Sequence, residues 1–217
     1  MRGPESTVVW GAGAWGTALA LHLQRAGGSV ALWVYEEAQF TSMVESRENR
    51  DFLPGHPLPD SIRLFHDSGE APGDAAAWIS VSPAQATRAL WREIGPRCPS
   101  GTLVISASKG IERESLLPVS ALIEEHLPPA AGPVVVLSGP SFAAGLAQGD
   151  PTAVVLASPD PSGAERAQRL LSHAPLRGYA STDRTGVELG GAVKNVIALA
   201  CGMASGLGFG PNTVAAL

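Results

Sequence analysis

A glycine-rich turn near the start of the chain constrains its fold more than any other feature. Gly11, Gly13 and Gly16 follow the apolar run Thr7–Trp10, which has the composition of a buried strand, and they open the helix-length segment Ala14–Ala26. Glycines at this spacing permit a tight turn from strand to helix, a close approach of a ligand to the backbone, and close packing of the helix on the strand. The turn therefore predicts a βαβ unit.

Short β-like runs alternate with helix-length segments along most of the 217 residues. The expected strands are Thr7–Trp10, Ser29–Val34, Ile62–Phe65, Ala76–Val81, Thr102–Ser106, Val134–Leu137 and Thr152–Ala157, with a further candidate at Arg177–Ala180. The expected helices are Ala14–Ala26, Glu36–Ser46, Gln85–Ile94, Ser115–Leu127 and Pro161–Ser172. This alternation predicts an α/β fold of the Rossmann type, with a doubly wound, mostly parallel sheet and helices on both faces.

The position of the glycine turn also predicts a dinucleotide site. Residues 11–16 bring the N–H groups and partial positive charge of a helix N-terminus to a cofactor pyrophosphate. Glu36 lies 20 residues after Gly16, where an acidic side chain can accept hydrogen bonds from the ribose 2′-hydroxyl. Tyr35, Glu36 and Glu37 offer no cation for a 2′-phosphate, which favours NAD(H) over NADP(H). In the alternative, the turn is an ordinary connection and the glutamates only begin a helix, where negative charge suits the dipole.

The pattern changes after about Thr185. Gly186–Ser205 is one long Ala/Gly/Val-rich segment without the alternation of a strand. We expect residues 1–184 to form the dinucleotide-binding domain and residues 185–217 to form the beginning of an all-helical substrate domain. Val214–Leu217 continues an apolar helical pattern without a cap, so we expect that domain to extend past Leu217.

Composition and charge exclude several classes of function. The net charge of −5 at pH 7 offers no basic surface for a nucleic acid. Cys98 and Cys201 lie far apart and the five His residues have no metal-like spacing, so we expect no metal and a reducing, cytoplasmic compartment. Val8–Leu23 is apolar, but its glycines and its weak N-terminal charge argue against a secretion signal, and no uninterrupted apolar run is long enough to predict a membrane span.

The lysines of this chain are unusual in number and position. Arg supplies 13 of the 15 basic side chains, which leaves Lys109 and Lys194 for tasks that arginine cannot perform, such as exchanging a proton. Lys109 follows an expected strand, at the sheet edge where ligands bind in open α/β folds. Lys194 lies within an apolar helical segment, where a lysine is costly unless it faces a cleft or solvent. The alternative is that both are chance surface lysines.

A third motif, Ser138-Gly139-Pro140-Ser141-Phe142, also follows an expected strand. A turn of this composition that opens a helix can offer backbone N–H groups and a hydroxyl to a substrate. The chain has no Gly-x-Ser-x-Gly turn between a strand and a helix, so the motif does not indicate a serine hydrolase.

Together these motifs resemble the bacterial NAD(P)-dependent sn-glycerol-3-phosphate dehydrogenase family. The matching segments are residues 11–20, 32–33, 49–55, 58–59, 108–112, 138–143, 151–153, 186–198 and 206–208. Residues 190–195, Gly-Gly-Ala-Val-Lys-Asn, are the most specific part of the resemblance, which extends over the whole chain.

The resemblance implies reversible reduction of dihydroxyacetone phosphate to sn-glycerol 3-phosphate, with hydride from the nicotinamide, in a homodimer that feeds glycerophospholipid synthesis. It assigns catalysis to Lys194, which exchanges the proton with the substrate oxygen, and to Lys109, which contacts substrate and cofactor. The other implied substrate contacts are Gly139, Ser141 and Asn195. The implied cofactor contacts are Gly11, Gly13, Ala14, Trp15, Gly16, Tyr35, Glu36, Lys109 and Ala143.

The chain departs from the family pattern in three places. Val34-Tyr35-Glu36 stands where the family often carries arginine, which weakens the case for NADP, and Ser82-Pro83 stands where Val-Pro is common. Family members also continue with an aspartate and an Arg-Asn pair that complete the site. The resemblance therefore implies that these 217 residues alone bind NAD(H) with negligible turnover.

Two other functions stay open on the sequence. One is a different lysine-dependent, two-domain reductase that acts on a hydroxy acid, and the other is a non-catalytic NAD-binding module. The paired lysines and the turn at residues 138–142 favour an enzyme, because a module that only binds NAD needs no more than the glycine turn.

Overall fold

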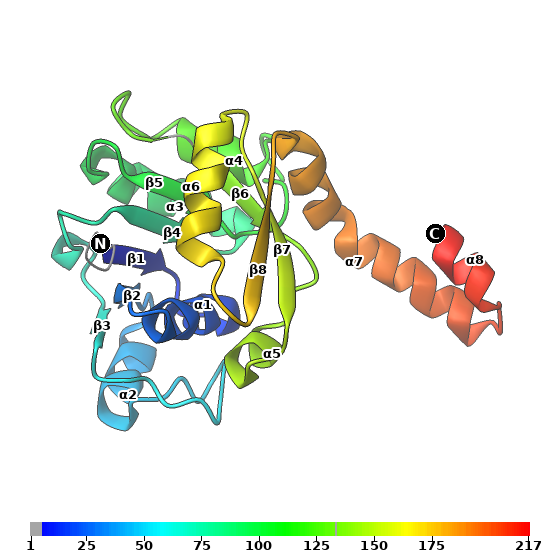
Figure 1. Ribbon diagram of the computed structural model, residues 1–217, viewed down its shortest axis with the longest axis horizontal. Helices are drawn as coiled ribbons and strands as arrows, with labels where there is room; N and C mark the ends of the chain where they lie inside the picture. The colour runs from blue at the N-terminus through cyan, green and yellow to red at the C-terminus, as the bar shows by residue number, and fades with distance from the viewer. Residues whose placement is uncertain (1–5, 133) are drawn as a thin grey trace.

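The computed structural model describes residues 6–132 and 134–217, which contain one eight-stranded sheet (Figure 1). Its strands are β1 (Ser6–Trp10), β2 (Ser29–Trp33), β3 (Ile62–Phe65), β4 (Ala77–Ser80), β5 (Leu103–Ser106), β6 (Val134–Ser138), β7 (Thr152–Ala157) and β8 (Leu176–Ser181). The order across the sheet is β3-β2-β1-β4-β5-β6-β7-β8. Neighbouring strands are parallel except β6 and β7, which are antiparallel. The expected Rossmann-type sheet is confirmed.

Helices cover both faces of the sheet. Those of the α/β body are α1 (Ala14–Arg25), α2 (Glu37–Ser46), α3 (Ala84–Ile94), α4 (Val119–Glu124), α5 (Ala143–Gln148) and α6 (Pro161–Leu171). Successive side chains of a strand point to opposite faces, so Val9 packs into the core beneath α1 while Val8 and Trp10 pack into an aromatic core with α3 and α4. The rings of Trp10 and Trp78 lie 5.0 Å apart in this second core.

The order of the strands determines where a ligand can enter. The chain runs outward from β1 through β2 to β3, then crosses back to β4 on the other side of β1. The carboxyl ends of β1 and β4 therefore stand at a topological switch point, where helices leave toward opposite faces and a crevice opens between them. The glycine turn, residues 11–16, lies at this point because it follows β1 directly.

The expected strands and helices occur close to the predicted positions, with one correction. The helix expected over Ser115–Leu127 spans only Val119–Glu124. Pro118 has extended backbone geometry and precedes the helix, and Leu116 has a φ of 58°. Because a proline restricts the residue before it to extended conformations, the helix cannot begin earlier than the proline.

The last part of the chain forms two helices that project from the body, α7 (Arg184–Gly206) and α8 (Pro211–Ala216) (Figure 1). The base of α7 is anchored to α4. The buried carboxylate of Glu188 accepts hydrogen bonds from the Ser120 N–H at 2.8 Å and the Ser120 hydroxyl at 2.7 Å, and Arg184 pairs with Glu124. These contacts fix the direction in which α7 leaves the sheet.

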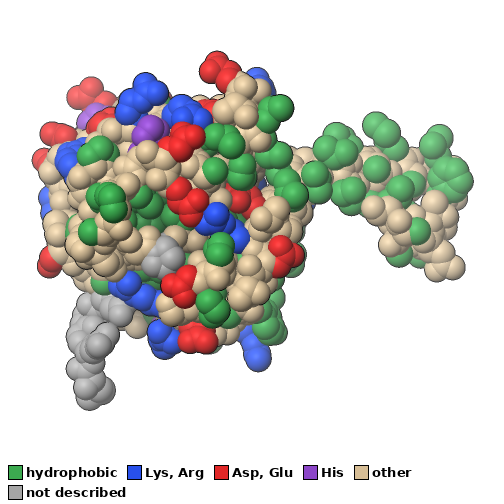
Figure 2. All heavy atoms as spheres, turned by 90° about the horizontal axis from the view of Figure 1, so that it is seen from above, with side chains coloured by type: hydrophobic (Ala, Val, Ile, Leu, Met, Phe, Trp, Pro, Cys, Tyr) green, Lys and Arg blue, Asp and Glu red, His purple; other side chains and the backbone are tan. Residues whose placement is uncertain are grey.

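The projecting part of α7 and the segment that follows it expose apolar side chains, seen along the arm in Figure 2. The large ones are Leu189, Val193, Val196, Ile197, Leu199, Met203, Leu207 and Phe209. By length and composition alone, α7 is apolar enough to cross a membrane. Arg184 and Glu188 nevertheless bond to α4, which ties this helix to the α/β body.

Candidate functional site

The larger of two adjoining cavities, about 810 Å³ in volume, opens at the switch point. It is bordered by the glycine turn after β1, the end of β2, one side of α3 and the loop after β5. Its lining residues include Gly11, Gly13, Trp15, Trp33, Tyr35, Glu36, Gln39, Phe52, Ser82, Pro83, Ser108, Lys109 and Ser141. Its place at the carboxyl ends of parallel strands is where dinucleotides bind in doubly wound folds.

The geometry of the glycine turn explains its sequence. Gly11 has a φ of 127°, and a Cβ there would lie 2.9 Å from the Val81 carbonyl oxygen on the neighbouring connection. Gly16 packs against the turn so closely that a Cβ would overlap the Gly11 carbonyl oxygen. A Cβ at Gly13, by contrast, would meet nothing within 4 Å, and Gly13 borders the cavity. The turn thus leaves an open cradle above Gly13.

This cradle fits a pyrophosphate. The first N–H groups of a helix have no partner within the helix, and α1 begins at Ala14 without a side-chain cap. Its first turn has no acidic residue to repel an anion. Gly13, Ala14 and Trp15 can therefore direct free N–H groups toward phosphate oxygens, as at other nucleotide-binding helix N-termini.

The part of the cavity at the end of β2 is acidic and aromatic. Tyr35 is exposed, and its ring packs edge-on against Trp33 at 5.6 Å. Glu36 precedes α2, and its carboxylate makes no capping hydrogen bond. Among the described residues that line the cavity, Lys109 is the only cation. It follows β5, which lies three strand positions, or about 14 Å, from β2 in the sheet. Beside Glu36, the described lining thus carries a negative charge and no cation.

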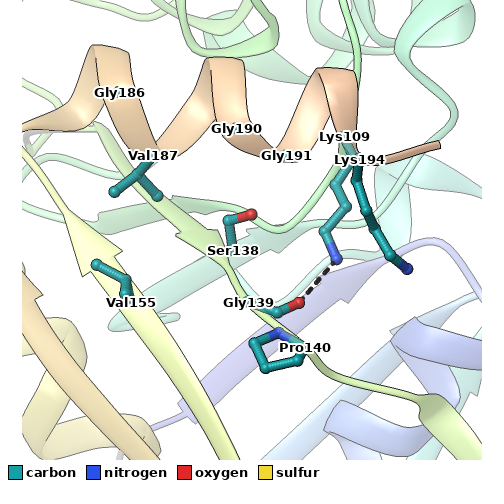
Figure 3. Close-up of a pocket in the computed structure, with 10 residues that line it drawn as sticks. All are labelled: Lys109, Ser138, Gly139, Pro140, Val155, Gly186, Val187, Gly190, Gly191 and Lys194. Atoms are coloured by element: carbon teal, nitrogen blue, oxygen red, sulfur yellow. Dashed lines mark hydrogen bonds between the residues drawn. The ribbon is translucent and has the colours of Figure 1, made fainter. Parts of the chain in front are cut away.

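A smaller cavity of about 310 Å³ lies between β6 and the inner side of α7 (Figure 3). Its lining residues are Lys109, Ser138, Gly139, Pro140, Val155, Gly186, Val187, Gly190, Gly191 and Lys194. The Lys109 Nζ donates a 3.3 Å hydrogen bond to the Gly139 carbonyl oxygen, whereas the Lys194 ammonium is turned away from it. Partial burial lowers the pKa of Lys109, and the positive charge of Lys194 lowers it further. The structure brings together both lysines that the sequence analysis singled out.

The loop that carries Lys109 is held by an ion pair. Arg88 of α3 donates hydrogen bonds to both carboxylate oxygens of Glu112, three residues beyond Lys109, at 2.8 to 3.1 Å. These bonds, with one from Ser115, lower the pKa of the Glu112 carboxyl to about 2. Glu112 therefore stays ionised, and the pair holds the loop, across the neutral pH range.

Lys194 is positioned by close packing of α7 on the end of β6. A Cβ at Gly191 would lie 2.8 Å from the Ser138 Oγ, so a larger residue there would force the Ser138 hydroxyl to move. Lys194 follows about one turn later, and its Nζ lies 5.2 Å from the centroid of the Phe142 ring. The exposed lysine thus stands at the rim of the smaller cavity.

Not every expected site residue borders a cavity. Asn195 is exposed on α7, rotated by about 100° from Lys194, and lines neither cavity. Ala14, Gly16 and Ala143 lie near the sites but outside both linings. The structure adds Gln39, Phe52, Ser82 and Ser108 to the larger cavity. The resemblance already included Phe52 and Ser108 within its matching segments, whereas no sequence pattern pointed to Gln39.

Comparison with known proteins identifies the family of this chain. Residues 6–164 match the family model described as NAD-dependent glycerol-3-phosphate dehydrogenase N-terminus. The chain belongs to this family. Residues 183–217, which include α7 and Lys194, match the model for the family's C-terminus. The predicted resemblance is confirmed, and with it a family that uses a nicotinamide cofactor.

Relatives named glycerol-3-phosphate dehydrogenase [NAD(P)+] are similar over nearly the whole chain. The one from Nitratidesulfovibrio vulgaris is 46% identical over 209 residues, which cover 96% of this chain and 63% of the relative. A second, from Mycobacterium bovis, is 44% identical over 218 residues, covering 100% of this chain and 65% of the relative. The chain thus spans just under two thirds of the length of these dehydrogenases.

Solved structures of the family share the fold. The glycerol-3-phosphate dehydrogenase from Coxiella burnetii has a TM-score of 0.88 and 33% identity, and the match covers 98% of this chain and 65% of that structure. The yeast dehydrogenase has a TM-score of 0.84 and 26% identity, covering 98% and 66%. The arrangement of sheet and helices therefore follows that of known glycerol-3-phosphate dehydrogenases.

Proposed function

We propose that this protein interconverts dihydroxyacetone phosphate and sn-glycerol 3-phosphate with a nicotinamide cofactor. The observation that carries the proposal is the position of Lys109, which lines both the larger cavity at the glycine turn and the smaller cavity that contains Lys194. A cofactor in the first cavity and a substrate in the second would meet beside this residue. The family to which the chain belongs supports the same reaction.

The two lysines suit the chemistry of a carbonyl reduction. The bound nicotinamide supplies the hydride to the carbonyl carbon. Negative charge then develops on the carbonyl oxygen, where the Lys194 ammonium stabilises it and donates a proton. In the oxidative direction, the neutral amine of Lys194 removes the proton from the hydroxyl. The hydrogen bond to the Gly139 carbonyl oxygen holds the Lys109 ammonium between the two cavities.

The small cavity is suited to a phosphorylated substrate of a few carbon atoms. Two ammonium groups supply positive charge at its rim, and Gly139 and Ser141 lie on the turn beside Lys109, with the Ser141 hydroxyl donating to the Gly139 carbonyl oxygen at 3.3 Å. Its volume of about 310 Å³ accommodates a small molecule. We also propose Asn195 as a substrate contact. Because Asn195 is exposed on α7 here, this contact requires the residue to be brought closer to the substrate.

NAD(H) is the proposed preferred cofactor. Glu36 borders the larger cavity with no capping bond to occupy its carboxylate, so it is free to accept hydrogen bonds from a ribose. A 2′-phosphate at the same position would meet a negative charge and no cation. The N-terminal position of Glu36 and Glu37 on α2 also agrees with a simple role in the helix dipole, and the two roles are compatible.

The organisation of the protein is also part of the proposal. The eight strands of the described sheet precede α7, which supports a boundary after residue 184 between a dinucleotide-binding domain and a helical substrate domain. The exposed apolar side chains of α7 support a homodimer, since large apolar patches mark sites of association. The free thiols of Cys98 and Cys201 support a cytoplasmic location.

An assay of NADH oxidation tests the reaction. The protein in its full natural length is expected to consume NADH with dihydroxyacetone phosphate, and not with dihydroxyacetone or small keto acids. Turnover of keto acids instead would favour a hydroxy-acid reductase, and NADH binding without turnover of any of these would favour a binding module. For the 217 residues alone we expect NADH binding but negligible turnover, because Lys194 is exposed to water, which weakens its interaction with a developing charge.

A further inference from the structure

The carbonyl of Ala12, in the middle of the glycine turn, is held by side chains from outside the turn. The Asn49 Nδ2 and the Gln39 Nε2 each donate a hydrogen bond of 2.8 Å to this oxygen. Ala12 and Asn49 are both buried, and Asn49 does not line either cavity. A buried side chain that is bonded to the turn but does not border the ligand space acts on a ligand through the residues that it holds.

Both the donor and the acceptor groups of the Asn49 amide make hydrogen bonds in this arrangement. Its second N–H donates to the Thr17 Oγ1 at 2.8 Å, and its Oδ1 lies 3.3 Å from both the Gln39 Nε2 and the Phe52 N–H. The orientation of the amide follows from the chemistry, because the Ala12 carbonyl oxygen can only accept hydrogen bonds. Asn49 therefore links the turn, the first helix and the segment after α2 in one network, and its side chain has no exposed surface.

The network determines the direction of the N–H group that faces the ligand. The Ala12 carbonyl and the Gly13 N–H belong to one planar trans peptide, so they point in opposite directions. Fixing the carbonyl toward Asn49 and Gln39 turns the Gly13 N–H away from them. Gly13 borders the cavity, and a Cβ there would meet nothing within 4 Å, so the space beside this peptide is open to a ligand.

We propose that Asn49 is a positioning residue that orients the Ala12–Gly13 peptide for the cofactor pyrophosphate. Without Asn49, only the Gln39 side chain restrains the Ala12 carbonyl, and the direction of the Gly13 N–H is less firmly fixed before the ligand arrives. The cost then falls on binding, because the ligand has to order the group that receives it. This inference rests on the proposed cofactor site and adds a residue to it that does not touch the cofactor.

The test compares ligands that do and do not contain a pyrophosphate. NADH binding is followed by energy transfer from Trp15 and Trp33, which border the cavity, and ADP-ribose and adenosine are measured as competitors. In Asn49→Asp, an isosteric carboxylate replaces the donor. The Kd values of NADH and ADP-ribose are expected to rise about tenfold or more, while that of adenosine changes by less than about twofold.

A pair of Thr17 variants and one control variant distinguish positioning from a general loss of stability. Thr17→Val removes the partner of the second Asn49 N–H at nearly constant volume, and we expect a smaller rise in the Kd of NADH that Thr17→Ser reverses. This pair decides the question if Asn49→Asp does not fold. Gln168→Met is the control, because the Gln168 Nε2 also donates to a backbone carbonyl, that of Gly178 at 2.8 Å, away from both cavities.

The possible outcomes are separable. If the unmutated chain does not bind NADH, the proposed cofactor site is wrong and this inference fails with it. If the chain binds NADH and the Asn49 and Thr17 variants bind it equally well, only the positioning role is overturned. A fall in thermal midpoint that is shared with Gln168→Met, without a change in the Kd of NADH, would likewise show that Asn49 serves only to stabilise the fold.

Discussion

The Lys109 ammonium donates a 3.3 Å hydrogen bond to the Gly139 carbonyl oxygen and so stands where the larger and smaller cavities adjoin. Carbonyl oxygens favour a protonated partner, but partial burial opposes the charge and Lys194 repels it, and together these effects lower the pKa of Lys109. The free protein therefore holds an ammonium that is easier to deprotonate than an ordinary lysine, at the place where an anionic substrate is proposed to bind.

Binding of sn-glycerol 3-phosphate is expected to be linked to proton uptake at Lys109. The bound dianion favours the ammonium and raises the lowered pKa. Between the pKa of the free protein and that of the complex, binding takes up a proton, and the affinity falls as the pH rises through this interval. Calorimetry in two buffers of different ionisation enthalpy, above about pH 8 where the phosphate is already dianionic, measures the uptake.

The matched variant for this measurement is Lys109→Arg. A guanidinium stays protonated over the same interval, so its complex should take up no proton. Proton uptake that is equal in the unmutated protein and in Lys109→Arg would assign it to another group.

Substitution of Lys194 by arginine is expected to abolish turnover with little effect on cofactor binding. Arginine keeps the positive charge but does not release its proton, and loss of acid–base catalysis costs about 10²–10⁴-fold in kcat. Lys194 lines only the smaller cavity, so the Kd of NADH should change by less than about twofold. Steady-state kinetics and an NADH titration, both on the protein in its full natural length, measure these effects. An Arg variant with most of its kcat would show that Lys194 contributes charge alone.

Glu36 is expected to determine the preference between the two nicotinamide cofactors. In Glu36→Gln the repulsion of a 2′-phosphate is removed, so the ratio of the NADPH Kd to the NADH Kd should fall by about tenfold. Glu37→Gln is the control, because Glu37 is exposed on the next position of α2 and does not line the cavity. Equal ratios in the two variants, or a preference of the unmutated chain for NADPH, would remove the argument.

The sheet was largely predictable because its determinants are local. Apolar runs such as Val134–Leu137 are recognisable from a few residues, and the glycine turn predicts the geometry on either side of it. The antiparallel pairing of β6 with β7 was not predictable in the same way. The direction of β7 depends on where the short helix α5 sends the chain, and this is a tertiary property that no local pattern contains.

The candidate site, too, was predictable only where its determinants are local. Lys109 and Lys194 stand out in the sequence by their rarity and neighbours, although only the fold shows that they line one cavity. Asn49 lay within a resembling segment but had no predicted role, since its partner is a backbone carbonyl, which every residue possesses. The exposure of Asn195 was also beyond sequence reasoning, because it depends on the rotation of α7 about its axis.

The buried imidazole of His22 is expected to make the stability of the fold depend on pH. His22 is 2% exposed, its Nε2 bonds to the Leu171 carbonyl oxygen at 2.9 Å, and burial is the main cause that lowers its pKa. As the pH falls from about 6.5, the unfolded chain takes up this proton before the folded chain does, so the free energy of unfolding decreases. In His22→Gln, which keeps a donor for Leu171, the thermal midpoint should fall less between about pH 7 and pH 5. The control is His56→Gln in a partly exposed loop, which should retain the pH dependence of the unmutated chain. Identical profiles for the three proteins would assign the acid sensitivity to carboxyl groups rather than to His22.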